Sequence, residues 1–441
     1  MSPEIVSILV LVAIFVIATI LPVNMGVLAF AAAVLVGGLI SGMTADELFA
    51  VFPGDLFIVL VGVTYLFGIA QVNGTVDWLV HLAVRGVGGH LAAIPWIMFC
   101  VAAVLTAVGA ASPAGVAIVA PIALGFAAQY GISPLLMGLL VVHGAQAGAF
   151  STISIYGAIV NGLVARAGLP QGEITLFLGS LVFNLVLALI VFVLFGGLAL
   201  LRRERAQVST PGPADSSEPN AEEQEAREDG RSEEGEAAED RGFTWQMGLT
   251  IAGILVVVAV AAGFGFDVGL VAITVAGVLA LFMPTLQREA VGRVSWSVVL
   301  LICGVLTYVG VLEEIGTIDY VGEAITQVGA PALAALLICY VGGIVSAFAS
   351  STGMLAAIIP LAVPFLQEGA VGAIGVVTAV AISTTVVDAS PLSTNGALVL
   401  ANAKNVDRDV LFRHLLAYGA VVAVVAPPLA WFVFVVLGIG S

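Results

Sequence analysis

Long apolar runs separated by short polar stretches follow one another along the whole chain. In the first half they cover about 5–21, 24–42, 56–72, 91–110, 113–128, 133–165 and 174–200, and in the second half 245–262, 268–284, 295–312, 331–349, 352–367, 370–402 and 411–438. An α-helix needs about 20 apolar residues to cross the hydrocarbon core of a bilayer. The pattern therefore predicts an all-α polytopic membrane protein. The shorter, mixed segments 75–88 and 318–328 are typical of interfacial amphipathic helices.

The apolar run at 370–402 has a polar interruption, at residues 387–396. Seven of these ten residues are polar, Pro or Gly, and Asp388 is an ionisable group at membrane depth. Pro391 lacks a backbone N–H and disfavours helix at the residue before it. Unwound backbone inside a membrane is tolerated only where protein buries it or where it lines a wet cavity. The segment thus predicts a break in the helix at a functional site.

A similar interruption lies 239 residues earlier, at residues 148–158. When the two segments are aligned, Ser151 matches Ser390, Ser154 matches Ser393 and Gly157 matches Gly396. Broken helices at corresponding positions of two halves indicate the binding site of a secondary transporter.

Further matches predict that the chain is an internal repeat with inverted halves. Gly62, Gly68, Gly74-Thr75 and Asp77 recur 242 residues later, and Ser112 and Pro121 recur 239 residues later. The expected units are a first repeat at 1–201, an acidic disordered linker at 202–242 and a second repeat at 243–441. Each repeat is expected to hold about five transmembrane helices, a re-entrant hairpin (about 91–128 and 331–367) and a broken helix (about 133–165 and 370–403).

Composition agrees with a membrane protein, since 61% of the residues are hydrophobic and only 10% are charged. The net charge of −16 is largely local, because residues 202–241 hold thirteen acids against six arginines. Lys and Arg mark cytoplasmic loops. With both termini outside, twelve of the thirteen basic residues lie on the cytoplasmic side together with the linker, and only Arg166 lies outside. We therefore expect a multi-pass protein of the plasma membrane.

The tips of the two hairpins, 110–114 and 349–353, are small and uncharged. A helix that starts just after Ser112 or Ser351 presents free N–H groups and the positive end of its dipole, which bind carboxylate oxygens without a basic side chain. Capping and close packing of small residues is the structural alternative. The candidate substrate-binding residues are Ser112, Ser350, Ser351, Thr352 and Asn395.

The two breaks supply hydroxyl and carbonyl oxygens, which are suited to a coupling ion such as Na⁺. The candidates are Ser151, Thr152, Ser154, Asp388, Ser390, Ser393 and Thr394. A kink made for packing is the structural alternative. Asp388 could also carry a proton, and Ala149 stands at its matching position. His143 could be a proton carrier or a satisfied core histidine.

Inverted repeats that each hold a hairpin and a broken helix resemble the ion transporter superfamily. Within it the chain is similar to divalent-anion/sodium symporters of the INDY type and to MatC-type malonate/dicarboxylate carriers, the latter through residues 148–161. The resemblance implies a homodimer with a static scaffold and a transport domain that moves as an elevator. It also implies a Ser-Asn-Thr triplet at each tip. Only Ser112, Ser351 and Thr352 fit that triplet, and both asparagines are absent.

These observations predict a secondary active symporter of a small carboxylate, such as malonate or succinate, coupled to Na⁺ or H⁺. The expected partners are the carboxylate, the lipid bilayer and a second copy of the chain, with no nucleic acid and no other cofactor. The alternatives are a cation/proton antiporter that uses Asp388, an intramembrane enzyme that uses Asp388 with His143, and a passive channel.

Overall fold

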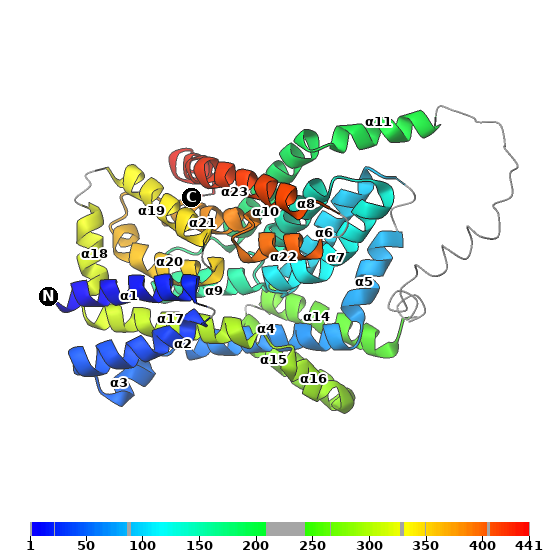
Figure 1. Ribbon diagram of the computed structural model, residues 1–441. Coiled ribbons are helices and arrows are strands. Elements are labelled where there is room, and N and C mark those ends of the chain that lie inside the picture. The colour runs from blue at the N-terminus through cyan, green and yellow to red at the C-terminus, as the bar shows by residue number, and fades with distance from the viewer. Residues whose placement is uncertain are drawn as a thin grey trace, which may run out of the picture.

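The structure is a computed structural model that describes residues 2–21, 23–85, 90–208, 243–264, 266–326, 330–348, 350–403 and 406–440. Within these ranges the regular elements are all helices (Figure 1). Most of the predicted linker lies outside the described residues. Its first residues were predicted to be disordered, but α11 continues through them to Val208. Six of the residues 202–208 are Arg, Glu, Ala or Gln, which are strong helix formers.

The first half builds twelve of these helices. They are α1 (Pro3–Ile20), α2 (Met25–Ala32), the π-helix η1 (Ala33–Ile40), α3 (Ala45–Ala50), α4 (Gly54–Val72), α5 (Thr75–Arg85), α6 (Ala93–Ala107), α7 (Ser112–Tyr130), α8 (Pro134–Gly148), α9 (Ile155–Arg166), α10 (Glu173–Leu194) and α11 (Gly197–Val208).

The described residues of the second half build α14 (Trp245–Phe264), α15 (Val268–Phe282), η2 (Pro284–Leu286), α16 (Gln287–Gly292), α17 (Trp296–Glu314), α18 (Thr317–Thr326), α19 (Pro331–Ser346), α20 (Ser351–Gln367), α21 (Ala373–Val386), η3 (Val387–Ala389), α22 (Thr394–Asn402), α23 (Arg408–Trp431) and η4 (Phe432–Val436). Helices α3 and α4 have the lengths of α16 and α17, which begin 242 residues later. The inverted relation of the two halves stays a prediction.

The main helix contacts come in matching pairs that join one half to the other. Helix α2 packs along α17 as α15 packs along α4, and α7 packs along α22 as α20 packs along α9. The amphipathic helices are exchanged in the same way, because α18 contacts α1 and α5 contacts α14. The second arm of each hairpin therefore lies beside the helix that follows the break of the other half.

Helices α2 and α17 approach so closely that only glycine fits at their crossing. A Cβ on Gly304 would lie 2.0 Å from the carbonyl oxygen of Gly26, and a Cβ on Gly26 would lie 1.9 Å from that of Leu300. Small residues at helix crossings in membranes let the backbones come into van der Waals contact.

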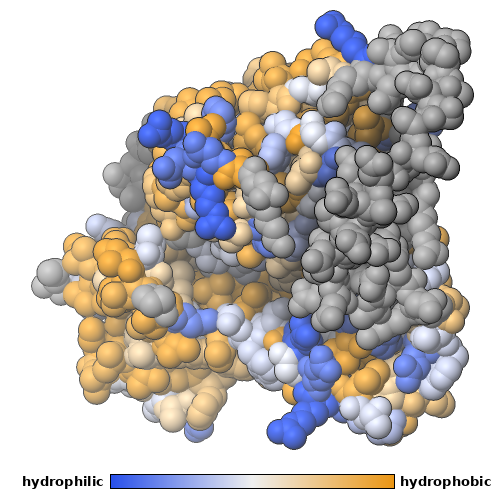
Figure 2. Space-filling view, turned by 45° about the vertical axis from the view of Figure 1, so that its right-hand side comes forward, coloured by the Kyte–Doolittle hydropathy of each residue, from blue (hydrophilic) through white to orange (hydrophobic). Residues whose placement is uncertain are grey.

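The outer surface agrees with a bilayer environment. Among the described residues, seven helices are long and apolar enough to cross a membrane, and an eighth span is possible if the bent pair Val268–Phe282 and Pro284–Gly292 is counted. The face in Figure 2 is mostly apolar, with the polar residues gathered in patches. In Figure 1, α5 and α18 lie at opposite ends of the molecule, turned across the long helices. This is the position expected of interfacial helices.

Candidate functional site between the hairpin tips and the helix breaks

Both interrupted helices unwind in the same way. Between α8 and α9 the Ser154 hydroxyl donates to the Ser151 carbonyl at 2.7 Å, and between η3 and α22 the Ser393 hydroxyl donates to the Ser390 carbonyl at 2.6 Å. The same two carbonyls also accept from the backbone N–H groups of Ser154 and Ser393, each at 3.0 Å, so each break is closed by a pair of hydrogen bonds. All four serines are buried, so these four hydroxyls face protein and not lipid.

A glycine permits each break to turn tightly into the next helix. A Cβ on Gly157 would lie 1.9 Å from the Ser151 carbonyl oxygen, and a Cβ on Gly396 would lie 2.0 Å from that of Ser390. Any other residue would push the serine carbonyl out of its place. The aligned glycines therefore hold the two serine carbonyls in equivalent positions.

The two hairpin tips differ at the start of their second arms. Helices α7 and α20 already include Ser112 and Ser351 as their first residues, whereas the sequence predicted a start just after them. Ser350 caps α20, since its hydroxyl accepts from the Gly353 N–H at 3.4 Å, while Ala111 gives α7 no side-chain cap. Pro113 removes one more donor from the first turn of α7. The second tip is thus richer in polar groups.

Both tips meet the second break. The Asn395 amide nitrogen donates to the Ser112 hydroxyl at 2.9 Å. The Ser351 hydroxyl and the N–H groups of Thr394 and Asn395 lie within hydrogen-bonding reach of the Asp388 carboxyl group, with the Asn395 N–H at 3.4 Å. The Ser393 hydroxyl, which donates to the Ser390 carbonyl, also lies beside this carboxyl group. Asp388 is only 4% exposed. Its carboxyl group is therefore surrounded by donors from a tip and a break.

The second tip also reaches the first half, because the Tyr156 hydroxyl of α9 lies within hydrogen-bonding reach of Thr352. Tyr156 and Asn395 are 239 residues apart, so they occupy the same position after the two breaks. Tyr156 contacts Thr352, and Asn395 contacts Ser112. The helix after each break thus places a polar side chain against the hairpin tip of the other half.

A cavity of about 470 Å³ lies where these elements meet. Its walls include Ala111 and Pro113 of the first tip, Ser350 and Thr352 of the second tip, Ile155 and Tyr156 after the first break, and Leu392, Ser393 and Thr394 of the second break. The remaining wall comes from α1, the loop to α2 and the start of α17, through residues such as Phe15, Thr19, Asn24, Ser297 and Leu301. Sequence reasoning missed this third wall.

The sequence-predicted residues divide into three groups. Ser350, Thr352, Ser393 and Thr394 line the cavity. Ser112, Ser351, Asp388, Ser390 and Asn395 are buried behind it, and so are Ser151 and Ser154 of the first break. Thr152 is exposed and does not line the cavity, so the structure does not bring it to the others.

His143 lies in a hydrogen-bonded chain away from this cavity. Its Nε2 is 2.5 Å from the Tyr418 hydroxyl and its Nδ1 is 3.0 Å from Asn184 Oδ1. The Asn184 amide nitrogen donates to the Ser180 carbonyl, so Oδ1 faces the ring and Nδ1 carries the proton. Both ring nitrogens are satisfied, as expected of a neutral core histidine. The sequence offered no signal for these partners, which come from α10 and α23.

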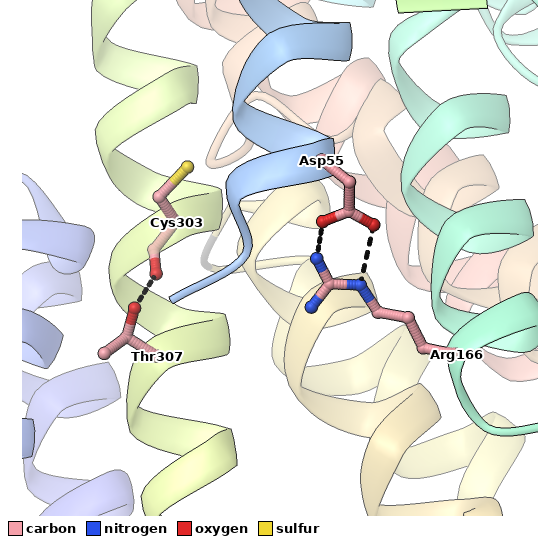
Figure 3. Close-up of polar contacts among 4 residues, drawn as sticks. All are labelled: Asp55, Arg166, Cys303 and Thr307. Atoms are coloured by element: carbon pink, nitrogen blue, oxygen red, sulfur yellow. Dashed lines mark hydrogen bonds and ion pairs between the residues drawn. The ribbon is translucent and has the colours of Figure 1, made fainter. Parts of the chain in front are cut away.

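An ion pair joins the last turn of α9 to the first turn of α4. Arg166 contacts Asp55 through Nε, at 3.0 Å from Oδ2, and through a terminal nitrogen that faces Oδ1. Figure 3 shows this two-point contact beside α17, where the Thr307 hydroxyl donates to the Cys303 carbonyl at 2.7 Å. Nearby, the Gln367 amide at the end of α20 donates to the Ala167 carbonyl at 3.1 Å.

Comparison with known proteins agrees with a transporter. The family described as the N-terminus of dicarboxylate carrier protein MatC matches residues 1–149. An uncharacterized transporter of Mycobacterium bovis and one of Mycobacterium tuberculosis are each 24% identical over 312 residues, which is 70% of this chain and 67% of the relative. The crystal structure of the Alcanivorax borkumensis YdaH transporter has the same fold, with a TM-score of 0.58 at 16% identity and 90% of each chain covered.

Fold, apolar surface and relatives define a multi-pass membrane transporter, and the comparisons point to a carrier and not to an enzyme. Within that class, its first 149 residues are similar to dicarboxylate carriers of the MatC type. This confirms the resemblance that residues 148–161 suggested.

Proposed function

We propose that the protein is a secondary active symporter that carries a small mono- or dicarboxylate, such as malonate or succinate, with Na⁺ or H⁺ as the coupling ion. The observation that carries the proposal is the 470 Å³ cavity, which both hairpin tips and both helix breaks enclose. Binding residues from two halves around one central cavity are the arrangement that alternating access requires.

The cavity suits an anion although it has no basic wall. None of the described residues that line it is Lys, Arg, His, Asp or Glu. Helix α20 begins at this wall, and its first N–H groups and the Thr352 hydroxyl can donate to a carboxylate. Ser393, Thr394 and Tyr156 add further hydroxyl groups. We therefore place the substrate carboxylate against the second tip.

The coupling ion is placed behind the cavity, at Asp388. Asn395 is fully buried and its Oδ1 has no hydrogen-bond partner among the described residues. An unpaired buried acceptor is costly, and a bound cation would satisfy it. Oxygens of Asp388, Asn395 and Ser351 would hold Na⁺, or Asp388 would take the proton. Binding of the cation orders the second tip, and the ordered tip then accepts the carboxylate. This dependence couples the ion gradient to the transport of the carboxylate.

We infer the conformation from the side of the membrane that the distribution of Lys and Arg predicts to be cytoplasmic. The third wall of the cavity comes from the end of α1, Asn24 and the start of α17, and all three lie on that side. On the other side, Asp55 and Arg166 hold α4 and α9 together. We propose that this is an inward-facing state of an elevator in a homodimer, in which the tips and breaks move against α2, α4, α15 and α17.

Uptake of labelled malonate and succinate into proteoliposomes, with Na⁺ and H⁺ gradients imposed separately, tests the proposal. We expect accumulation that needs one of the gradients and that is slower in Ser351→Ala when the coupling ion is limiting. Replacing Na⁺ by choline identifies the ion. Uptake that merely equilibrates the label, whichever gradient is imposed, would indicate a passive channel.

A cation/proton antiporter is the second candidate, and the burial of Asp388 among donors favours it. It needs no carboxylate, so it predicts Na⁺-driven proton efflux from the same vesicles with no uptake of either label. Efflux that is lost in Asp388→Asn would then replace the symporter proposal.

A further inference from the structure

A second cavity of about 400 Å³ opens between α10 and α23, away from the tips and breaks. Its walls are apolar side chains such as Leu187, Leu194, Val421 and Val425, together with His414 at one end and the ring of Tyr418. Several of these apolar side chains are also exposed, Val421 by 60% and Leu194 by 69%. The cavity is therefore a groove that faces the hydrocarbon core.

The groove has the length of a lipid acyl chain. On α23 its lining runs from His414 to Leu429. At 1.5 Å per residue this is about 22 Å, more than the ~15 Å depth of one leaflet of the hydrocarbon core. Helices α10 and α23 both pack on α8 and α21, so the groove runs between two helices that share the same support. A flexible chain can fill the gap that remains.

The end of the groove at His414 is basic. Arg413 precedes His414 and is exposed, and Arg202 follows α10 on α11 and is also exposed. Asp407 and Asp409 lie at the start of α23, where Asp407 caps the helix by accepting from two N–H groups. Basic groups at the cytoplasmic end of membrane helices attract anionic lipid headgroups.

The floor of the groove is connected to the transport core. Tyr418 lines the groove and its hydroxyl contacts His143. From His143 the hydrogen bonds pass through Asn184 and Ser180 to Gln146, whose amide nitrogen donates to the Thr385 carbonyl at 2.8 Å. Gln146 and Thr385 lie just before the two breaks. A molecule that fixes Tyr418 thus also stabilises the ends of α8 and α21.

We propose that an anionic phospholipid binds this groove, with one acyl chain between α10 and α23 and its phosphate beside Arg413 and His414. Occupancy of the groove holds Tyr418 against His143 and so supports the packing of the two broken helices. The basic end of the groove fits the lipid phosphate, and the apolar walls fit its acyl chain.

Native mass spectrometry of the purified full-length protein tests this, with phosphatidylglycerol or phosphatidylcholine added to the detergent-solubilised chain. We compare the wild type with Ala417→Trp, which fills the groove, and with Ala420→Trp, which adds the same side chain at an exposed position of α23 outside the groove. We expect one phosphatidylglycerol to bind wild type and Ala420→Trp, and about tenfold weaker binding to Ala417→Trp, since displaced methylene groups lose their burial.

Arg413→Gln keeps the groove and removes the charge. It should lower the affinity for phosphatidylglycerol roughly fivefold and leave that for phosphatidylcholine unchanged. Equal binding of both lipids to the wild type, or equal binding of phosphatidylglycerol to the two tryptophan variants, would overturn the proposal. A change from dimer to monomer in Ala417→Trp alone would overturn it as well and assign the groove to a second copy of the chain.

Discussion

The two helix breaks are built on one plan and differ in one charged residue. In both, a serine hydroxyl donates to the carbonyl of the serine three residues before it, and a glycine lets that carbonyl approach the next helix. In the first break Ala149 stands where the second has Asp388. The shared plan places oxygens at two equivalent points, and the difference is the reason that we propose the second point as the cation site.

The hydroxyls of the first break are used within the protein. The Ser151 hydroxyl donates to the Ala107 carbonyl at the end of α6, and the Ser154 hydroxyl also contacts the Ala149 carbonyl. In the second break the Asp388 carboxyl group gathers donors from the tip and from α22 instead. The first break is thus mainly a structural corner beside the cavity, and the second is the one that we propose as the ion site.

The largest effect that this comparison predicts is for Asp388→Asn. Removing one partner of a buried charge interaction costs ~2 kcal/mol or more, so we expect at least about thirtyfold slower gradient-driven uptake of the labelled carboxylate. Asp409→Asn, an exposed acid on α23, is the control and should transport normally. Normal driven uptake by Asp388→Asn in well-folded protein would show that the charge difference between the breaks is not functional.

Substitutions at the second hairpin tip should also impair transport more than those at the first tip, but the effects should be smaller than that of Asp388→Asn. Ser351 faces Asp388, whereas the Ser112 hydroxyl accepts from the neutral amide of Asn395. We expect Ser351→Ala to weaken the apparent affinity for the coupling ion by about tenfold and Ser112→Ala by about threefold, as the loss of hydrogen bonds to charged and neutral groups suggests. The measurement is uptake rate against ion concentration. The reverse order would place the ion at the first tip.

Tyr156→Phe tests the first half's contribution to the substrate wall. It removes the hydroxyl that reaches Thr352 and keeps the ring that lines the cavity. The loss of one neutral hydrogen bond predicts about a three- to tenfold higher KM for the carboxylate with an unchanged dependence on the coupling ion. Tyr130→Phe, at the exposed end of α7, is the matched control. An altered ion dependence would move Tyr156 from the substrate to the ion site.

The sequence predicted the fold class and the location of the unwound segments because both depend on local patterns. Apolar run lengths give the spans, and Ser, Gly and Pro at residues 387–396 mark the place where a helix ends. Asn395 was among the predicted substrate-binding residues, but Tyr156, which lies 239 residues earlier, was not. What a side chain contacts across the halves depends on how α7 packs on α22 and α20 on α9.

Residues that local patterns do not mark could not be predicted. Phe15 and Ser297 belong to ordinary apolar spans, and only the approach of α1 and α17 to the tips makes them part of the cavity. The partners of His143 lie 41 and 275 residues away in sequence. Thr152 had the right chemistry and a place in the break, but the turn of the backbone leaves it exposed.

The smallest predicted effect concerns the ion pair on the side opposite the open cavity. Asp55 lies on α4 and Arg166 lies on α9, so a movement of α9 against α4 must break their contact. The intact ion pair therefore stabilises the proposed inward-facing state. Their side chains are 59% and 37% exposed, so the pair is worth ~1 kcal/mol or less. Arg166→Gln should therefore shift the population toward the outward-facing state by about fivefold at most.

Labelling of a cysteine introduced at Ser297, in the third wall of the cavity, reports that population, and it should slow from the cytoplasmic side in Arg166→Gln. The control is Arg293→Gln, whose partner Glu289 lies on the same helix, so that this pair bridges no moving parts. If both variants label at the wild-type rate, the Asp55–Arg166 contact does not favour either state and the two sides of the cavity are balanced by packing alone.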